Sequence, residues 1–174
     1  MKKIIFILVA MLGIASANAQ FKDSGFKVIG EVGSNVTRMF VNGGGDGFGI
    51  VAPGAEVSLG TNVCPNFFVG GGVGYDAWVP VGDLKDSMPN THHEMKAFAH
   101  GRYYMSAEGN GLIADVKLGY KRNLSADFNQ DAFDIFVGPG YMFGGKFSVS
   151  AGYSGAYHKD FKLHGAALKF GMEF

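Results

Sequence analysis

The last nine residues, Ala166 to Phe174, read A-A-L-K-F-G-M-E-F and alternate in polarity. Leu168, Phe170, Met172 and Phe174 occupy every second position, and the residues between them are charged or small. A period of two residues is the signature of a β-strand with one apolar and one polar face. The strand ends on a large apolar side chain, which is typical of a strand that closes a transmembrane barrel by pairing with the first strand.

The same period recurs along the chain and predicts eight antiparallel strands. They are expected at Phe26–Thr37, Phe48–Gly60, Phe67–Asp76, His93–Tyr104, Leu112–Lys121, Phe133–Phe143, Phe147–Tyr157 and Ala166–Phe174. Each is about ten residues long, which is the length that a tilted strand needs to cross a bilayer. Pro53 lacks a backbone donor, so a local irregularity or bulge is expected in the second strand.

The connections between these strands differ in length. If the N-terminus is periplasmic, short periplasmic connections are expected at 61–66, 106–110 and 144–145. The remaining connections would face outwards, at 41–47, 80–90, 124–131 and the brief tip 158–160. Short turns at one end and longer loops at the other are expected of an up-and-down transmembrane barrel.

Charged side chains within the predicted strands fall on the polar faces. Six are basic and seven acidic: Lys27, Glu31, Glu56, Asp76, Glu94, Lys96, Arg102, Asp115, Lys117, Lys121, Asp134, Lys169 and Glu173. The balance of charge suits pairing inside a narrow lumen, where unpaired charges would be costly. We therefore predict a polar network in the lumen, formed by these residues and by His100, which lies between Lys96 and Arg102 on the same face.

The opposite faces are apolar along their middles and are predicted to contact lipid. Aromatic residues gather towards the strand ends, as an interfacial girdle requires: Tyr75, Trp78, Tyr103, Tyr120, Tyr141, Phe143, Tyr157 and Phe174. Arg122 and Lys162 share the apolar parity but lie at strand ends, where a side chain reaches water, and Arg38 lies just beyond the first strand.

The N-terminal segment reads as a secretory signal peptide. Lys2 and Lys3 precede a short apolar run, and Ala17-Asn18-Ala19 forms a small-residue cleavage site. Cleavage after Ala19 divides the chain into a signal peptide at 1–19 and a barrel domain at 20–174. The remaining 13 basic and 15 acidic side chains give no reason to expect nucleic-acid binding.

No cofactor or metal site is expected. Cys64 is the only cysteine, so neither an intramolecular disulfide nor a cysteine-based metal site is possible. In His92-His93-Glu94, adjacent strand residues point to opposite faces, which argues against a metal site. The stretch Gly140 to Lys146 matches a phosphate-binding loop only up to its lysine, and we interpret it as a hairpin turn.

The chain resembles the small outer-membrane β-barrel domain of Gram-negative bacteria, often described as porin-family or opacity-like. The resemblance rests on G-F-K-V-I-G-E-V-G-S-N-V at Gly25–Val36, V-G-P-G-Y at Val137–Tyr141 and the terminal K-F-G-M-E-F. It implies residence in the outer membrane, among its lipids. It also implies insertion by the barrel-assembly machinery, which would read Leu168, Phe170, Met172 and Phe174 as its signal.

The expected function is that of a non-enzymatic outer-membrane barrel with a structural or surface-interaction role. Eight strands leave an interior just wide enough for side chains to fill, so an open pore is not expected. The loop 80–90 is the best candidate for contact with an extracellular or envelope partner. Two alternatives remain: a lipid-modifying enzyme with His100 as general base, and a soluble periplasmic barrel that binds a small apolar ligand.

Overall fold

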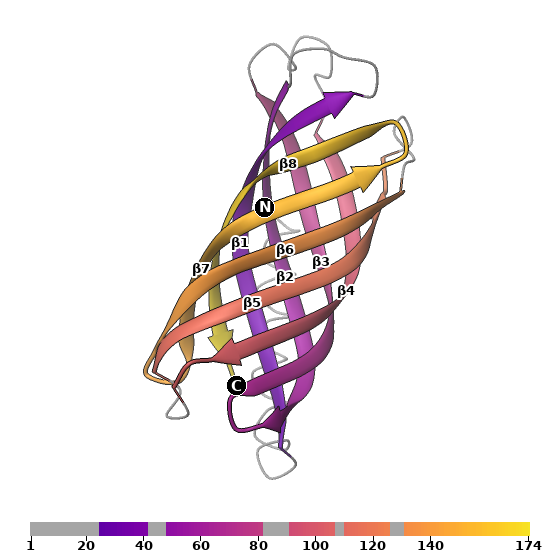
Figure 1. Ribbon diagram of the computed structural model, residues 1–174. Coiled ribbons are helices and arrows are strands. Elements are labelled where there is room, and N and C mark those ends of the chain that lie inside the picture. Colours follow the sequence, from indigo (N-terminus) through magenta and orange to yellow (C-terminus); the bar gives the residue numbers. More distant parts are fainter. Residues whose placement is uncertain (1–24, 42–47, 82–90, 107–109, 126–130) are drawn as a thin grey trace, which may run out of the picture.

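The chain forms one closed barrel of eight antiparallel strands in sequence order (Figure 1). The computed structural model describes residues 25–41, 48–81, 91–106, 110–125 and 131–174. The strands are β1 (Phe26–Val41), β2 (Phe48–Cys64), β3 (Phe67–Val81), β4 (His92–Tyr104), β5 (Gly111–Asn123), β6 (Asp131–Phe143), β7 (Phe147–His158) and β8 (Phe161–Glu173). The predicted all-β, up-and-down fold is confirmed. In the described ranges, no helix has the length and hydrophobicity needed to cross a membrane.

The last strand closes the barrel against the first, as its sequence predicts. The β1–β8 register runs from Ile29 opposite Glu173 to Val41 opposite Phe161. Beyond Glu173, Phe174 and Val28 exchange two backbone hydrogen bonds of 2.9 and 3.1 Å. Because the sheet closes on itself, it has no open edge with unpaired backbone groups.

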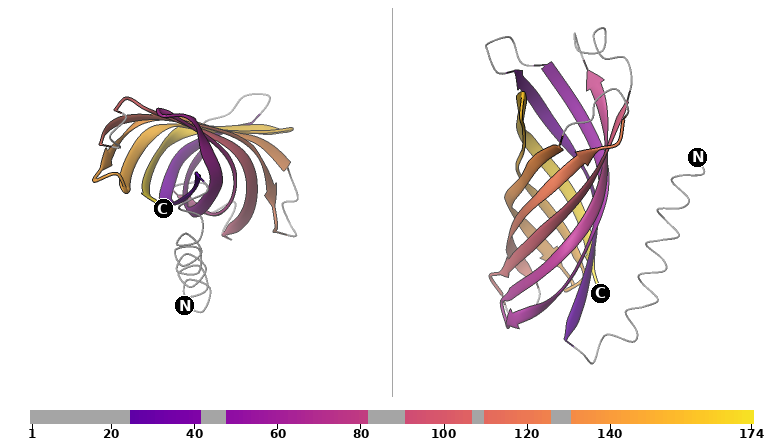
Figure 2. Two further views of the ribbon diagram at one scale, coloured as in Figure 1. Left: turned by 90° about the horizontal axis from the view of Figure 1, so that it is seen from below. Right: turned by 90° about the vertical axis from the view of Figure 1, so that its right-hand side faces the viewer.

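All strands run obliquely to the long axis of the barrel (Figures 1 and 2). We call the end at which β2, β4 and β6 finish the turn end, and the end at which β1, β3, β5 and β7 finish the loop end. At the turn end, Gly144 and Gly145 have φ values of 59° and 65°, a backbone conformation that favours glycine. This confirms the predicted hairpin turn there.

The strands are longer than predicted, at 12 to 17 residues. β2 continues through the predicted connection 61–66 to Cys64, so the turn itself is confined to Pro65 and Asn66. The local irregularity predicted near Pro53 is present, because the β2–β3 pairing is interrupted at Ala52 and Pro53. It is not a bulge, because the register is the same on both sides of that proline. The register shifts between Asn62 and Cys64 instead. Pro53 is exposed on the outer face.

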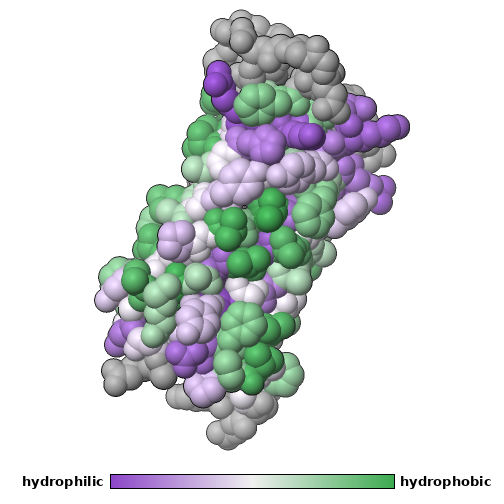
Figure 3. Space-filling view, in the orientation of Figure 1, coloured by the Kyte–Doolittle hydropathy of each residue, from purple (hydrophilic) through white to green (hydrophobic). Residues whose placement is uncertain are grey.

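Side chains alternate between the two faces of the barrel wall. The outer face exposes apolar residues from every strand, and Figure 3 shows them as hydrophobic patches along the barrel. The exposed residues include Val36, Leu59, Val73, Met95, Leu118, Val137, Tyr153 and Phe170. Most charged residues of the strands are buried inside, and the exposed ones, Arg38, Arg122, Asp131 and Lys162, lie near the loop end. This arrangement is the reverse of a soluble barrel and suits a surrounding of lipid.

The interior has three layers. At the turn end lies an apolar cluster of Ile29, Phe68, Tyr104, Ile113 and Met142. At the loop end lies a second apolar cluster, called here the loop-end cluster, of Met39, Ile50, Ala52, Trp78, Ala132, Ala156, Phe161 and Leu163. The charged residues occupy the strand positions between these two clusters.

Trp78 does not belong to the interfacial girdle that the sequence predicts. Its side chain is 2% exposed and packs edge-on against the rings of His158 and Phe161, with centroids 5.5 and 6.4 Å apart. Even-numbered residues of β3 point inward, and Trp78 has the same parity as Asp76, which also lies inside. The pleat of the strand therefore decides its direction, although its position near a strand end suggested an interface.

Candidate functional site: the charged interior

The structure places the predicted lumen residues on the inner face of the barrel. Thirteen of them are buried: Glu31, Glu56, Asp76, Glu94, Lys96, His100, Arg102, Asp115, Lys117, Lys121, Asp134, Lys169 and Glu173. Lys27 lies at the turn end, where its side chain is 32% exposed. β4 and β5 supply half of the fourteen residues, whereas the inner face of β7 carries the serines Ser148, Ser150 and Ser154.

Arg102 is the centre of the network near the turn end, and its side chain is fully buried. Its guanidinium group donates two hydrogen bonds to Asp115, of 2.6 and 3.0 Å, in a bidentate pair. It also donates to Glu173 at 2.6 Å and to Glu31 at 3.0 Å. One cation thus joins carboxylates from β1, β5 and β8. Planar, bidentate geometry of this kind is what an arginine provides and a lysine does not.

Lys117 extends the network towards the middle of the barrel. Its ammonium group donates to both Glu31 and Glu56, which project from neighbouring strands β1 and β2. Glu56 also pairs with Lys96 and Lys169, each at 2.8 Å. Glu56 is therefore surrounded by three lysines from three different strands, which compensates its burial.

Lys121 is the centre of the network nearest the loop end. Its ammonium group lies 3.0 Å from both Asp76 and Asp134, and 3.8 Å from Glu94. Asp76 also accepts hydrogen bonds from Lys96 at 3.2 and 3.3 Å. Lys96 thereby connects this group of residues to Glu56 and to the rest of the network.

These contacts join all the charged residues of the set into one continuous network. It begins at Lys27, which pairs with Glu173 at 3.3 Å, and continues through Arg102 to the residues around Lys121. A buried charge is tolerated when it is paired and hydrogen-bonded. Acids and bases that alternate across the lumen supply that pairing, and Glu94 has the longest ion pair, with Lys121 at 3.8 Å.

Glycines on the inner face make room for the network. A Cβ atom at Gly54 would lie 2.0 Å from a carboxylate oxygen of Asp76. One at Gly74 would lie 2.5 Å from Cε of Lys96 and 2.9 Å from Cβ of Glu56. These glycines on β2 and β3 therefore allow charged side chains to lie flat against the barrel wall.

Ser58, His100 and Asp115 form a triad that sequence reasoning missed. Nδ1 of His100 lies 2.9 Å from Oγ of Ser58, and Nε2 lies 3.3 Å from a carboxylate oxygen of Asp115. All three side chains are buried, and the rings of Phe68 and Phe98 pack edge-on against the imidazole. Ser58 shares the inward parity of Glu56, which is the one sequence signal that pointed to it.

This triad has the order of a nucleophile, a base and an orienting acid, but its serine is enclosed by the surrounding side chains. Ser58 has no exposed surface, and Asp115 is already engaged by Arg102. A small cavity inside the barrel is lined by Glu31, Glu56, Asp76, Lys96 and Lys169, among others, and not by Ser58 or His100. The contacts of His100 therefore fit a structural hydrogen bond network in the lumen.

The remaining sequence features lie in different places. His92 points inward, and His93 hydrogen-bonds to Tyr75 on the outer face, so the pair is split as strand alternation predicts. Within the described ranges, no group of three or more potential ligands is placed to hold a metal ion. The predicted signal peptide at 1–19 and most of the loop 80–90 lie outside the described residues.

Neither a protein-family model nor a curated protein matches this sequence. Solved structures match its fold. Ail, the attachment invasion locus protein of Yersinia pestis, has a TM-score of 0.54 at 13% identity, covering 86% of this chain and 99% of that one. The N-terminal β-barrel domain of Pseudomonas aeruginosa OprF has a TM-score of 0.53 at 18% identity, covering 85% and 97%. Neisserial surface protein A has a TM-score of 0.53 at 12% identity, covering 86% and 96%.

These likenesses concern the fold. The chain has the architecture of a small eight-stranded outer-membrane β-barrel, which confirms the fold class and the structural resemblance predicted from its sequence. The predicted outer-membrane location agrees with them. The identities of 12 to 18% carry no information about a ligand or an activity of this chain.

Proposed function

We propose that this chain is a non-enzymatic outer-membrane barrel whose interior is closed by side chains and whose rigid wall presents loops at the cell surface. The observation that carries this proposal is the continuous network of buried ion pairs across the lumen, with an apolar cluster at each end. A pore needs a hydrated passage lined by polar groups. Here the polar groups are used for pairing with one another.

The proposal includes an orientation and a route to the membrane. The turn end and both ends of the barrel sequence would face the periplasm, and the loops, among them 80–90, would face outwards and contact a partner. A signal peptide at 1–19 would direct export. The outward-facing residues Leu168, Phe170 and Phe174 of the closing strand, together with Met172, would serve as the signal for the barrel-assembly machinery.

The soluble alternative conflicts with the outer surface. A soluble periplasmic barrel would expose charged residues and enclose apolar ones. This barrel exposes Val36, Leu118 and Phe170 by about half of their surface, at 59%, 44% and 51%. We expect the protein to fractionate with outer membranes and to show heat-modifiable gel mobility. Recovery in the soluble periplasm without detergent would contradict the proposed location.

A lipid-modifying enzyme is the second candidate, because Ser58, His100 and Asp115 have the geometry of a triad. We expect a deletion strain, the strain complemented with wild type and strains carrying Ser58→Ala or His100→Ala to have the same lipid composition by mass spectrometry. An altered acyl pattern that wild type restores and both variants fail to restore would instead establish the enzyme.

Planar-bilayer recording tests the closed interior directly. We expect the refolded protein to insert without a steady, large conductance. Lys117→Ala removes a lysine that lies between Glu31 and Glu56, and it tests whether the loss of one interior side chain opens the lumen. Leu118→Ala, which changes the neighbouring residue on the outer face, is the control. A large conductance of the wild-type protein would overturn the proposal of a filled lumen.

A further inference from the structure

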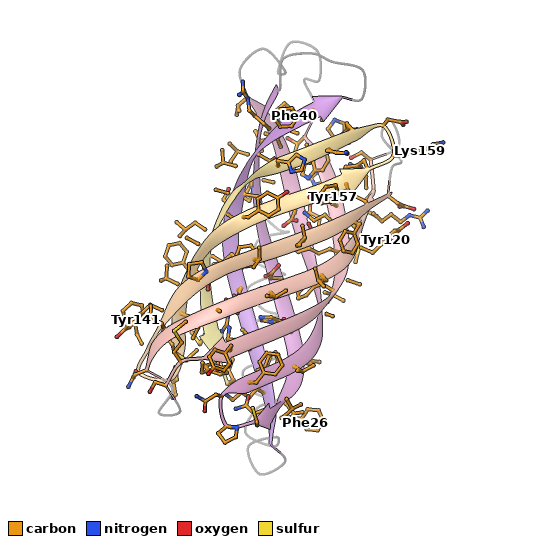
Figure 4. All side chains as sticks on the ribbon, viewed as in Figure 1. Phe26, Phe40, Tyr120, Tyr141, Tyr157 and Lys159 are labelled. Atoms are coloured by element: carbon orange, nitrogen blue, oxygen red, sulfur yellow. The ribbon has the colours of Figure 1, made fainter. Side chains whose placement is uncertain are left out.

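The outer face of the barrel carries a compact group of cationic and aromatic residues near the loop end, on three adjacent strands. We call it the rim patch. It consists of Arg38 and Phe40 on β1, Tyr153 and Tyr157 on β7, and Lys162 and His164 on β8. Figure 4 labels Phe40 and Tyr157, which both lie towards the loop end. None of these side chains takes part in the charged interior.

The pairing of the strands brings the rim patch together. Arg38 lies opposite His164, and Phe40 lies opposite Lys162, across the seam that closes the barrel. On the other side of β8, Tyr157 lies opposite Lys162. Directly opposite side chains are ~5 Å apart at Cβ and diagonal neighbours ~7–8 Å. The long side chains of Arg38 and Lys162 can therefore reach the same group of atoms.

Hydrogen bonds hold the centre of the rim patch in place. The hydroxyl group of Tyr153 lies 2.5 Å from Nδ1 of His164 and 3.0 Å from the hydroxyl group of Tyr157. Tyr153 reaches His164 by lying over Gly155, where a Cβ atom would be only 2.6 Å from the tyrosine hydroxyl. The centre of the patch is thus a preorganised, hydrogen-bonded group rather than a set of independent surface residues.

The cationic residues of the rim patch differ from Arg122, another cationic residue on the outer face, in the acidic residues near them. No acidic side chain in the described ranges is within ion-pair distance of Arg38 or Lys162. On the next strands along the wall, β5 and β6, Arg122 lies opposite Asp131 in the β5–β6 register. Asp160 is the acidic residue closest in sequence to the patch, in the bend between β7 and β8. Among the residues that the structure describes, Arg38 and Lys162 therefore form no ion pair that would offset their charge.

The surroundings of the rim patch identify the kind of anion it would bind. On the same strands, the outward residues towards the middle of the barrel are apolar: Val36 follows Arg38 on β1 and is 59% exposed, and Ala166 and then Leu168, 45% exposed, follow His164 on β8. A ligand that contacts both regions must have an anionic head and an apolar tail. Arginine and lysine bind phosphate oxygens well, and tyrosine hydroxyls donate to them. An anchor of this kind lies at the level of lipid headgroups.

We propose that the rim patch binds the phosphate group of a membrane lipid, with Arg38 and Lys162 as the charged contacts. Tyr153, Tyr157 and His164 hydrogen-bond to one another and support the site, and their chain of hydrogen bonds leaves one proton free for a ligand. This inference rests on the proposed transmembrane function, because it requires lipid at the outer wall. It assigns a specific headgroup chemistry to one side of the loop end.

The test uses the full-length barrel in detergent micelles and native mass spectrometry. The probes are phosphatidic acid and phosphatidylcholine with identical acyl chains. We expect the wild-type protein to retain phosphatidic acid roughly tenfold more than phosphatidylcholine. The phosphate of phosphatidic acid is an exposed monoester, whereas the phosphate of phosphatidylcholine is a diester whose charge is offset by the attached choline cation. The variant Arg38→Gln/Lys162→Gln should lose this preference. The charge-matched control Arg122→Gln/Lys146→Gln, whose residues lie outside the patch, should keep it.

Three results would overturn the assignment. The first is an unchanged preference in the patch variant, and the second is an equal loss in the control, which would show that only net charge matters. The third is full displacement of phosphatidic acid by millimolar inorganic phosphate, which would identify a free anion as the ligand. Heat-modifiable gel mobility shows that each variant is folded. It also separates a failed patch from a failed barrel, since a failed barrel would lack the mobility shift in the wild type.

Discussion

The barrel interior contains two regions of different chemistry. In the middle, Arg102, Lys117 and Lys121 organise a network in which each buried charge depends on partners from other strands. At the loop end, the inward side chains are apolar, and Trp78 packs against Phe161. The stability of the charged layer depends on the pairing of its charges, and the stability of the loop-end cluster depends on the volume of its side chains. The two layers should therefore respond to different kinds of substitution, and this difference can be measured.

The largest effect is expected from removing charge at the centre of the network. Arg102→Met keeps much of the side-chain volume but leaves Asp115, Glu31 and Glu173 without their common cation. We expect the free energy of unfolding to fall by about 5 kcal/mol, the upper part of the range for breaking a buried pair. Unfolding by urea in lipid vesicles, followed by gel mobility, measures it.

The control for this prediction is Arg122→Met, which removes the same group from the outer face at the end of β5. It should change the free energy of unfolding by about 0.5 kcal/mol or less. If Arg102→Met were equally mild, the charged layer would contribute little, and packing alone would stabilise the interior.

The next effect is expected from removing volume in the loop-end cluster. Trp78→Ala deletes the largest side chain there and should lower the free energy of unfolding by about 3 kcal/mol through the cavity it leaves. Trp78→Phe should be milder because it retains most of the volume. Both variants leave the net charge unchanged.

The same residue reports which face it occupies, because it is the only tryptophan in the chain. Its fluorescence should escape quenching by lipids with brominated acyl chains. In the matched variant Trp78→Phe/Tyr120→Trp, the tryptophan stands on the outer face, where Tyr120 is 53% exposed, and should be quenched. Strong quenching of the wild-type protein would place Trp78 at the lipid interface and contradict the packed loop-end cluster.

A smaller effect is expected where the wall itself makes room for the charges. Gly74→Ala would bring a methyl group within 2.9 Å of Cβ of Glu56 and displace Lys96. We expect a loss of about 2 kcal/mol by overpacking. Gly71→Ala is the control on the same strand, because its Cβ atom would face outward with its nearest contact at 3.7 Å. Equal effects of the two would mean that strand propensity, rather than the network, sets the requirement for glycine.

Much of this architecture follows from the period of two residues. Glu56 and Lys117 share the polar parity of their strands, and a closed barrel leaves only the lumen for that face. The closing of β8 on β1 likewise follows from the alternation at the end of the chain. The ion-pair partners of Glu56 and Lys117 cannot be predicted from this period. Lys117 contacts Glu31, which is 86 residues away in sequence, and such contacts depend on the stagger between strands.

In the loop-end cluster, the alternation of side chains along the strand predicts the position of Trp78 better than the preference of aromatic residues for membrane interfaces. Trp78 follows Asp76 by two residues, so the pleat places both inside, yet aromatic residues near strand ends are also typical of membrane interfaces. Two rules conflicted at one residue, and backbone geometry decided the outcome. Ser58 was missed for another reason, since a serine on a mixed face gives no signal until its partner His100 is located.

The smallest effect is expected at the edge of the charged layer, where water reaches the network. Lys27 contacts Glu173 at 3.3 Å, but its side chain is 32% exposed, so the pair gains little over solvated charges. Lys27→Ala should lower the free energy of unfolding by less than about 1 kcal/mol. That loss should nearly vanish at 1 M salt, where the screening length is only about 3 Å.

The comparison with Lys117→Ala sharpens this point, since Lys117 is buried between Glu31 and Glu56 and is shielded from ions in the solvent. Its effect should be several times larger and nearly independent of salt, because removal leaves two buried carboxylates with one cation fewer. For each variant, the loss in free energy of unfolding relative to wild type is measured at low and at high salt. The salt dependence of that loss shows which residues of the network solvent ions reach. Equal salt dependence at both positions would mean that ions penetrate the lumen, and the charged layer would then be a hydrated channel lining.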